Sequence, residues 1–158
     1  MIIIIAAFMV VTSLAFAGDM KPLKTGPKDK CPVCGMFVTK YPDFAAQIQF
    51  RDGSTFHFDG AKDMFKFLHD LAKYAPGHRK EDIAGIYVTD FYNLERIDAR
   101  KAIFVTGSDV LGPMGHELVP LASQADADDF LKEHKGRKIL PFDRVSLDVP
   151  GSLDAGKF

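Results

Sequence analysis

Residues 44–58, FAAQIQFRDGSTFHF, contain the pattern that decides the fold. Apolar side chains alternate along residues 44–50 and again along residues 55–58, with Arg-Asp-Gly-Ser between the two runs. Alternation with a period of two is typical of half-buried strands, and an Asp-Gly pair between such strands supplies the positive φ angles of a tight turn. The sequence therefore predicts a β-hairpin here.

A helix and a third strand are predicted after this hairpin. The apolar side chains of residues 61–74 keep one stripe at helical period, Asp59 stands where an N-cap is expected, and Pro76 with Gly77 ends the pattern. Residues 85–92 are rich in β-branched and aromatic types, which favour a strand. The order in this half is strand, strand, helix, strand.

The second half of the chain repeats this order although hardly any residues repeat. Ser123 and Asp126 form a capping box at the start of its helix. We therefore predict an α+β protein in which two similar ββαβ units, at residues 31–95 and 96–148, are packed together. The strands and the helix of the second unit are predicted at residues 102–106, 117–121, 124–134 and 138–145.

The two ends of the chain have a different character. Residues 1–17 carry no charge and close on Ala-Phe-Ala, which predicts an export signal cleaved before Gly18. An uncleaved anchor is the alternative, because an uncharged stretch of 17 residues reaches the lower limit for spanning a bilayer. Residues 18–30, with four Lys, two Pro and two Gly, predict a flexible arm, and residues 149–158 a frayed tail.

Composition excludes several classes of function. With 158 residues, 47% of them hydrophobic, and a net charge of -1, the chain is an ordinary globular protein without the basic field that nucleic acid requires. It contains no G-x-S-x-G elbow, Walker loop or H-E-x-x-H motif. The acidic run at residues 126–129 suits the first turn of a helix. We therefore expect no enzyme activity.

The densest chemistry is the segment CPVCGM at residues 31–36. Cys31, Cys34 and Met36 offer two thiols and a thioether, and such soft ligands select Cu(I), whereas Zn(II) prefers thiolate and imidazole. Two alternatives remain open, a local disulfide and a thioredoxin-like redox dithiol. A redox dithiol is expected at a helix N-terminus, whereas a predicted arm precedes this pair.

A second soft cluster is the segment GPMGH at residues 112–116, with Met114 and His116. Taken alone, Met114 would more often fill a gap in a core. If the two units pack as pseudo-equivalents, this loop approaches the CPVCGM segment, the metal lies between the units, and the arm acts as a mobile flap. His57, on a predicted strand, is expected to be a surface or satisfied histidine. The candidate metal ligands are Cys31, Cys34, Met36, Met114 and His116.

Three motifs taken together, CPVCGM, FDGAKDM at residues 58–64 and GPMGHE at residues 112–117, resemble the NosL family. The resemblance covers about residues 31–145. It implies a periplasmic Cu(I)-binding metallochaperone of two similar ββαβ units. It also implies delivery of copper, through a membrane transport complex for copper and sulfur, to the copper–sulfide centre of nitrous oxide reductase.

The resemblance also implies site residues. Cys34 and Met36 match the sulfur-rich motif of the family, and Met114 and His116 match its second loop. Family members are commonly lipoproteins with a cysteine directly after the signal sequence, but Gly18 occupies that place here, so we expect no lipid anchor. A periplasmic thiol–disulfide oxidoreductase using the cysteine pair is the alternative function.

Overall fold

The computed structural model describes residues 20–158, so the predicted export signal lies outside the described residues. The strands are β1 (Ala46–Phe50), β2 (Thr55–Phe58), β3 (Ile83–Thr89), β4 (Arg96–Asp98), β5 (Ile103–Thr106), β6 (Leu111–Gly112), β7 (Gly115–His116), β8 (Val119–Leu121) and β9 (Lys138–Pro141). The α-helices are α1 (Ala61–His69), α2 (Leu71–Tyr74), α3 (Gln124–Glu133) and α4 (Asp148–Asp154), and short 3-10 helices cover Val38–Lys40, Lys80–Asp82 and Phe142–Arg144. Within the described residues, no helix combines the length and apolar character needed to cross a membrane.

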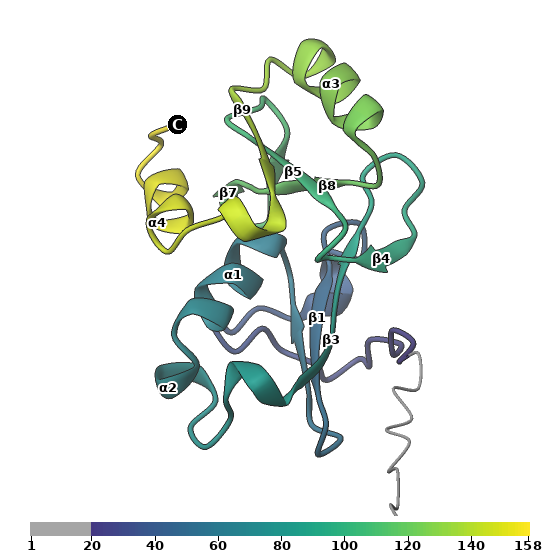
Figure 1. Ribbon diagram of the computed structural model, residues 1–158, viewed down its shortest axis with the longest axis vertical. Helices are drawn as coiled ribbons and strands as arrows, with labels where there is room; N and C mark the ends of the chain where they lie inside the picture. Colours follow the sequence, from purple (N-terminus) through teal and green to yellow (C-terminus); the bar gives the residue numbers. More distant parts are fainter. Residues whose placement is uncertain (1–19) are drawn as a thin grey trace, which may run out of the picture.

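Two antiparallel sheets share one strand order, which confirms the predicted α+β class and the repeated ββαβ arrangement. The order is β2-β1-β3-β4 in the first sheet and β8-β5-β9 in the second. In each, the first strand of the unit is central, the second strand lies on one side, and the strand that follows the helix lies on the other. Figure 1 shows the second unit, with α3, stacked above the first, with α1 and α2.

The predicted β1–β2 hairpin and the predicted start of α3 are both present, and each depends on residues that are close in sequence. Strands β1 and β2 pair from Ala46–Phe58 to Gln49–Thr55, and Gly53 turns the hairpin with a φ of 89°. The backbone N–H of Asp126 donates to Ser123 Oγ at 3.1 Å, so the predicted N-cap at the start of α3 is confirmed, and the Ser123 hydroxyl donates in turn to Asp126 Oδ2 at 2.6 Å.

The hydrophobic core joins the two units because β5 faces both sides. Phe104 packs into the large core of the first unit, where its ring meets that of Phe65 edge-on at 5.1 Å. Val105, the next residue, packs with Phe130 in a smaller core under α3. Since successive side chains of a strand point to opposite faces, one strand connects both cores and fixes the units against each other.

Three expectations are corrected by the structure. The helix predicted over residues 61–74 breaks at Asp70, whose non-helical backbone and carboxylate, accepting from Lys73 N at 3.2 Å, start α2 instead. Residues 20–30 are not a loose arm, because Gln47 forms two hydrogen bonds with the backbone of Leu23, at 2.9 and 3.1 Å. The tail forms α4, with Leu153 buried.

Candidate metal centre

The CPVCGM segment forms a tight loop that brings its two thiols together. The N–H of Cys31 donates to Met36 O at 2.9 Å, and the N–H of Gly35 donates to Cys31 O at 2.8 Å. Gly35 has a φ of 79°, a left-handed conformation that glycine adopts without strain. A β-bridge between Lys30 and Phe37 closes the base of the loop. The loop is therefore fixed by its own backbone rather than by the thiols.

Two carboxylates complete the cluster. The thiol of Cys34 donates to both oxygens of Asp59, at 3.2 and 3.3 Å, and the thiol of Cys31 donates to Asp63 Oδ2 at 3.4 Å. One ligand atom from each of these four residues lies within 4.8 Å of all the others. We call Cys31, Cys34, Asp59 and Asp63 the Cys–Asp cluster. Cys31 is fully buried, whereas Cys34 is partly exposed, so the cluster is open on the side of Cys34.

Helix α1 positions both carboxylates, because Asp59 directly precedes its N-cap, Gly60, and Asp63 lies in its first turn. Asp59 was expected to cap this helix, but its carboxylate accepts from the thiol of Cys34 instead. The N-cap residue is Gly60, which has no side chain to accept from the N–H groups of the first turn. Glu117 of the second unit provides the capping hydrogen bond in its place, because its carboxylate accepts from the backbone N–H of Lys62 at 2.6 Å. A side chain at Gly60 would collide with this carboxylate, which explains the glycine.

Burial and the neighbouring carboxylates keep both thiols protonated. Burial first, and then hydrogen bonding to the carboxylates, raise the pKa of Cys34 to about 11 and raise the pKa of Cys31 even more strongly. The negative charge of Asp63 is offset by Lys66, whose Nζ lies 3.1 Å from Asp63 Oδ1. A cation that binds here must displace thiol protons to obtain thiolate ligands.

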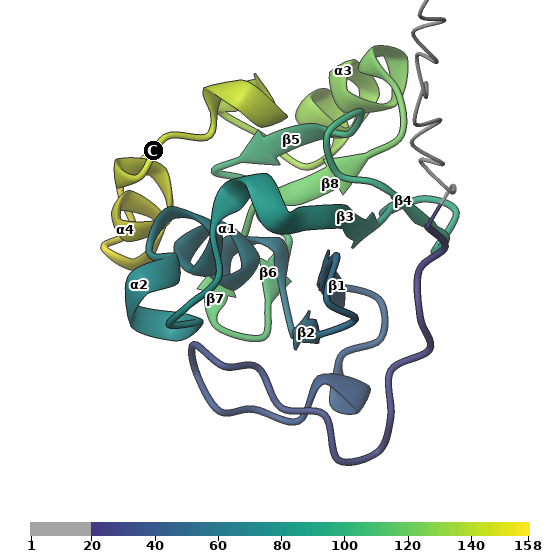
Figure 2. The same ribbon diagram turned by 60° about the horizontal axis from the view of Figure 1, so that its bottom comes forward.

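The second unit reaches the same end of α1 through the β6–β7 hairpin, as Figure 2 shows. Lys62, fully buried on α1, donates from Nζ to Met114 O at 2.9 Å in the turn of this hairpin. The side chain of Met114 is 48% exposed and therefore does not fill a gap in the core. The GPMGH turn thus lies against the helical turn that carries Asp63.

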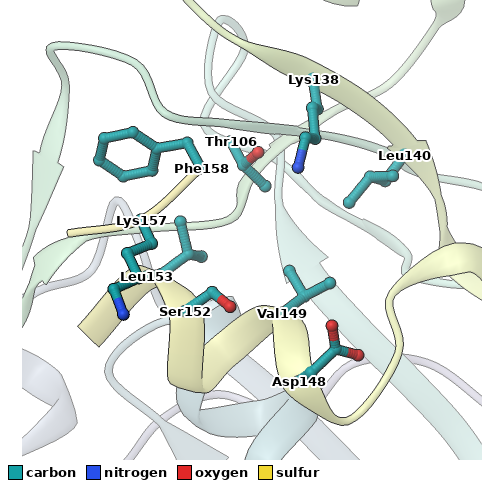
Figure 3. Close-up of a pocket in the computed structure, with 9 residues that line it drawn as sticks. All are labelled: Thr106, Lys138, Leu140, Asp148, Val149, Ser152, Leu153, Lys157 and Phe158. Carbon is teal, nitrogen blue, oxygen red and sulfur yellow. The ribbon is translucent and has the colours of Figure 1, made fainter. Parts of the chain in front are cut away.

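His116 faces away from that turn. Its ring packs edge-on against Phe158, with the ring centroids 4.5 Å apart, while Glu117, the next residue, points to α1. The Nδ1 atom of His116 is buried and has no hydrogen-bond partner among residues 20–158. Phe158 also lines a cavity of about 200 Å³ between α4 and β9, shown in Figure 3. In this arrangement the imidazole of His116 lies outside the Cys–Asp cluster.

Comparison with known proteins gives the same assignment from three directions. The family model described as NosL matches residues 22–150. The chain belongs to the NosL family. The "Copper-binding lipoprotein NosL" of Stutzerimonas stutzeri is 28% identical over 135 residues, which cover 80% of this chain and 67% of that protein. The structure described as "Crystal structure of the copper chaperone NosL from Shewanella denitrificans" is similar with a TM-score of 0.67 and 25% identity, covering 80% of this chain and 96% of that one.

In this NosL chain the five ligands predicted from the sequence are placed differently. Cys31 and Cys34 lie together, and Met36 closes the same loop. Met114 and His116 share a hairpin, in which the backbone carbonyl of Met114 accepts from Lys62 of α1. His57 was expected to be a surface or satisfied histidine, and it has a polar partner: its Nε2 lies 3.3 Å from Asp29 Oδ2.

Sequence reasoning missed the two carboxylates of the Cys–Asp cluster. A signal for them was present in FDGAKDM, where Asp59 and Asp63 are four residues apart across the start of a predicted helix. Residues four apart in a helix lie on one face, so the pair could have been expected to act together. What the sequence does not show is that this face meets the thiols.

Proposed function

We propose that this chain is a periplasmic metallochaperone that carries Cu(I) and supplies it for assembly of the copper–sulfide centre of nitrous oxide reductase. The observation that carries the proposal is the pair of thiols of Cys31 and Cys34, held together by a closed loop and open on one side. Two NosL relatives that are described as copper-binding and as a copper chaperone support the choice of cargo.

The proposed ligands are soft donors, which suit Cu(I). The thiolates of Cys31 and Cys34 hold the ion, with the thioethers of Met36 and Met114 beside them. His116 offers an unpartnered Nδ1 and joins only when its ring leaves Phe158. A site with few ligands and an exposed Met114 leaves room for a donor of the receiving protein to bind before an original ligand leaves.

Membership of the NosL family supports the choice of partners. We propose that a membrane transport complex for copper and sulfur, and nitrous oxide reductase itself, receive the ion. Export by residues 1–17, with cleavage before Gly18, would place the chain in the periplasm without a lipid anchor. Carrying an ion requires binding and release but no turnover, so the proposal assigns no enzymatic reaction.

The alternative, a thiol–disulfide oxidoreductase, is less well supported. Such an enzyme needs an attacking thiol with a pKa near or below the ambient pH, usually at a helix N-terminus. Here the pKa of Cys34 is raised to about 11, and the cysteines lie in a loop. The carboxylates that raise the pKa oppose nucleophilic attack but do not prevent a metal ion from displacing the protons.

The test is an anaerobic titration of the reduced protein with Cu(I), followed by native mass spectrometry. We expect one Cu(I) per monomer and a clear preference over Zn(II) in direct competition. Replacing both cysteines, Cys31→Ser with Cys34→Ser, should abolish binding, whereas His134→Gln, at the C-terminal end of α3, serves as the control and should not. Equal affinities for Zn(II) and Cu(I) would contradict the proposal, because its basis is the softness of the ligands.

A further inference from the structure

The loop that carries the thiols belongs to a strongly basic segment of an otherwise acidic protein. Residues 20–40 contain five lysines and a single acidic residue, Asp29, although the chain as a whole has a net charge of -1. Asp29 is already engaged, accepting from Gly26 N at 2.7 Å and pairing with His57. We call the five lysines the basic edge. Its members are Lys21, Lys24, Lys28, Lys30 and Lys40.

The basic edge is exposed and unpaired. All five lysines are exposed, and none has a carboxylate within 4.0 Å among residues 20–158. The backbone beneath them is held in place, because Gln49 Nε2 donates to Lys21 O at 2.9 Å and the hydroxyl of Tyr87 donates to Met20 O. Figure 2 shows residues 20–40 running along one rim of the molecule. The lysines therefore extend from a backbone that is held against the first sheet.

An exposed aromatic ring lies within this edge. Phe37 directly follows Met36 of the CPVCGM loop and is 39% exposed. Lys30 Nζ lies 4.7 Å from the centroid of its ring, and Lys40 Nζ lies 6.0 Å from it. An apolar surface with a charged rim is the usual anatomy of a protein-binding site, and buried aromatic residues often dominate its energetics.

Lys30 and Phe37 lie next to the loop that holds the thiols, where the ion would leave the protein. An ion passes between proteins by ligand exchange, so a donor of the partner must come within bonding distance of the ion, about 2–2.5 Å. Lys30 directly precedes Cys31, and Phe37 lies three residues after Cys34, at the base of the same loop. A partner that reaches the thiols therefore comes close to both residues.

We propose that the basic edge and Phe37 form a docking surface for a protein that presents acidic side chains around an apolar patch. The inference deepens the proposed function, because it takes the thiol loop as the point of transfer. Charge complementarity of this kind raises the association rate and orients the partner, and salt weakens it. A bilayer with anionic lipids would also attract lysines, but it offers no thiolate or thioether to take the ion.

The experiment uses two fluorescent peptides and the reduced, metal-free protein. Both peptides contain Met-x-x-Met, one flanked by glutamates and the other by lysines, and their binding is followed by fluorescence anisotropy. We expect the glutamate peptide to bind at least about tenfold more tightly at low ionic strength, and the difference to vanish near about 0.5 M salt. Phe37→Ala should weaken binding of the glutamate peptide at both salt concentrations.

Matched double variants separate a local surface from overall charge. Lys28→Glu with Lys40→Glu should abolish the preference, whereas Lys80→Glu with Lys101→Glu, exposed lysines outside the basic edge, changes the net charge equally and should preserve it. Equal losses in the two variants would overturn the proposal, and so would equal binding of the two peptides. It would also be overturned if vesicles containing phosphatidylglycerol bound through the same lysines while neither peptide did.

The peptide measurement contains no copper, so its result tests the docking surface separately from the proposed copper cargo. If the protein binds no Cu(I) but keeps its preference for the glutamate peptide, the proposed cargo is wrong and the docking surface stands. If it binds Cu(I) equally well with and without the lysine substitutions but never prefers the glutamate peptide, the docking surface is wrong and the cargo stands.

Discussion

Raising the pH should strengthen Cu(I) binding steeply, because both thiols keep their protons in the metal-free protein. The pKa of Cys34 is raised to about 11 and that of Cys31 is raised even more strongly, so both remain protonated between about pH 7.5 and pH 9.5. Bound Cu(I) needs thiolates, and each displaced proton contributes about a factor of ten per pH unit. Two protons over two pH units predict a gain of about 10,000-fold, or about 5.4 kcal/mol.

The assay is anaerobic competition with a chromogenic Cu(I) chelator of known pH dependence. The logarithm of the affinity should rise with a slope of two per pH unit in the natural chain, and with a slope of one in Cys31→Ser and in Cys34→Ser. Met114→Leu is the control, because it removes a thioether that carries no proton and should leave the slope at two. A slope of one in the natural chain would mean that a single thiolate binds, and a slope of zero would refute the cysteine pair as the site.

Three further predictions concern single side chains. Met114→Leu should lower Cu(I) affinity in the same competition assay and change the free energy of unfolding in urea by less than about 1.5 kcal/mol, because the side chain is half exposed. Burial raises the pKa of Glu117 to about 7, so its contribution to the free energy of unfolding is complete below about pH 4.5 and is lost as the pH rises through 7. Over that range the free energy of unfolding of the natural chain should fall by on the order of 3 kcal/mol relative to that of Glu117→Gln, and a difference that does not change with pH would contradict this. Phe130→Ala should cost about 3–5 kcal/mol in the same denaturation measurement, because Phe130 is fully buried under Phe91.

The fold could be predicted where its determinants are neighbours in sequence. Gly53 in the β1–β2 turn and Ser123 at the start of α3 act within a few residues, and both elements form as expected. The repeated order of strands and helix is a sum of such local signals, so the ββαβ arrangement followed from them. The break at Asp70 was missed because a helical apolar stripe continues past it, while its carboxylate prefers the backbone N–H of Lys73.

The candidate site could be predicted only in part. The sulfur-rich loop is contiguous, so Cys31 and Cys34 could be paired from the sequence. The carboxylate of Asp59 was assigned to a helix cap, because a sequence does not show that Glu117, from the other unit, supplies that hydrogen bond. The ordered arm was missed for the same reason, since the alternation of Gln47 and Gln49 along β1 indicates a polar face but does not show that this face binds the backbone of the arm.

The contacts of buried Lys62 bear on whether the two ββαβ units could fold as separate fragments. The repeated architecture suggests two modules that could be expressed apart, yet the buried ammonium of Lys62 is neutralised by Asp154 at 3.0 Å and bonded to Met114 O, both from the second half. A fragment ending before β5 would retain an ammonium without its partners and a helix N-terminus without Glu117. We therefore expect the first half not to fold by itself, and we expect recovery of the native state from fragments to require both halves in one solution.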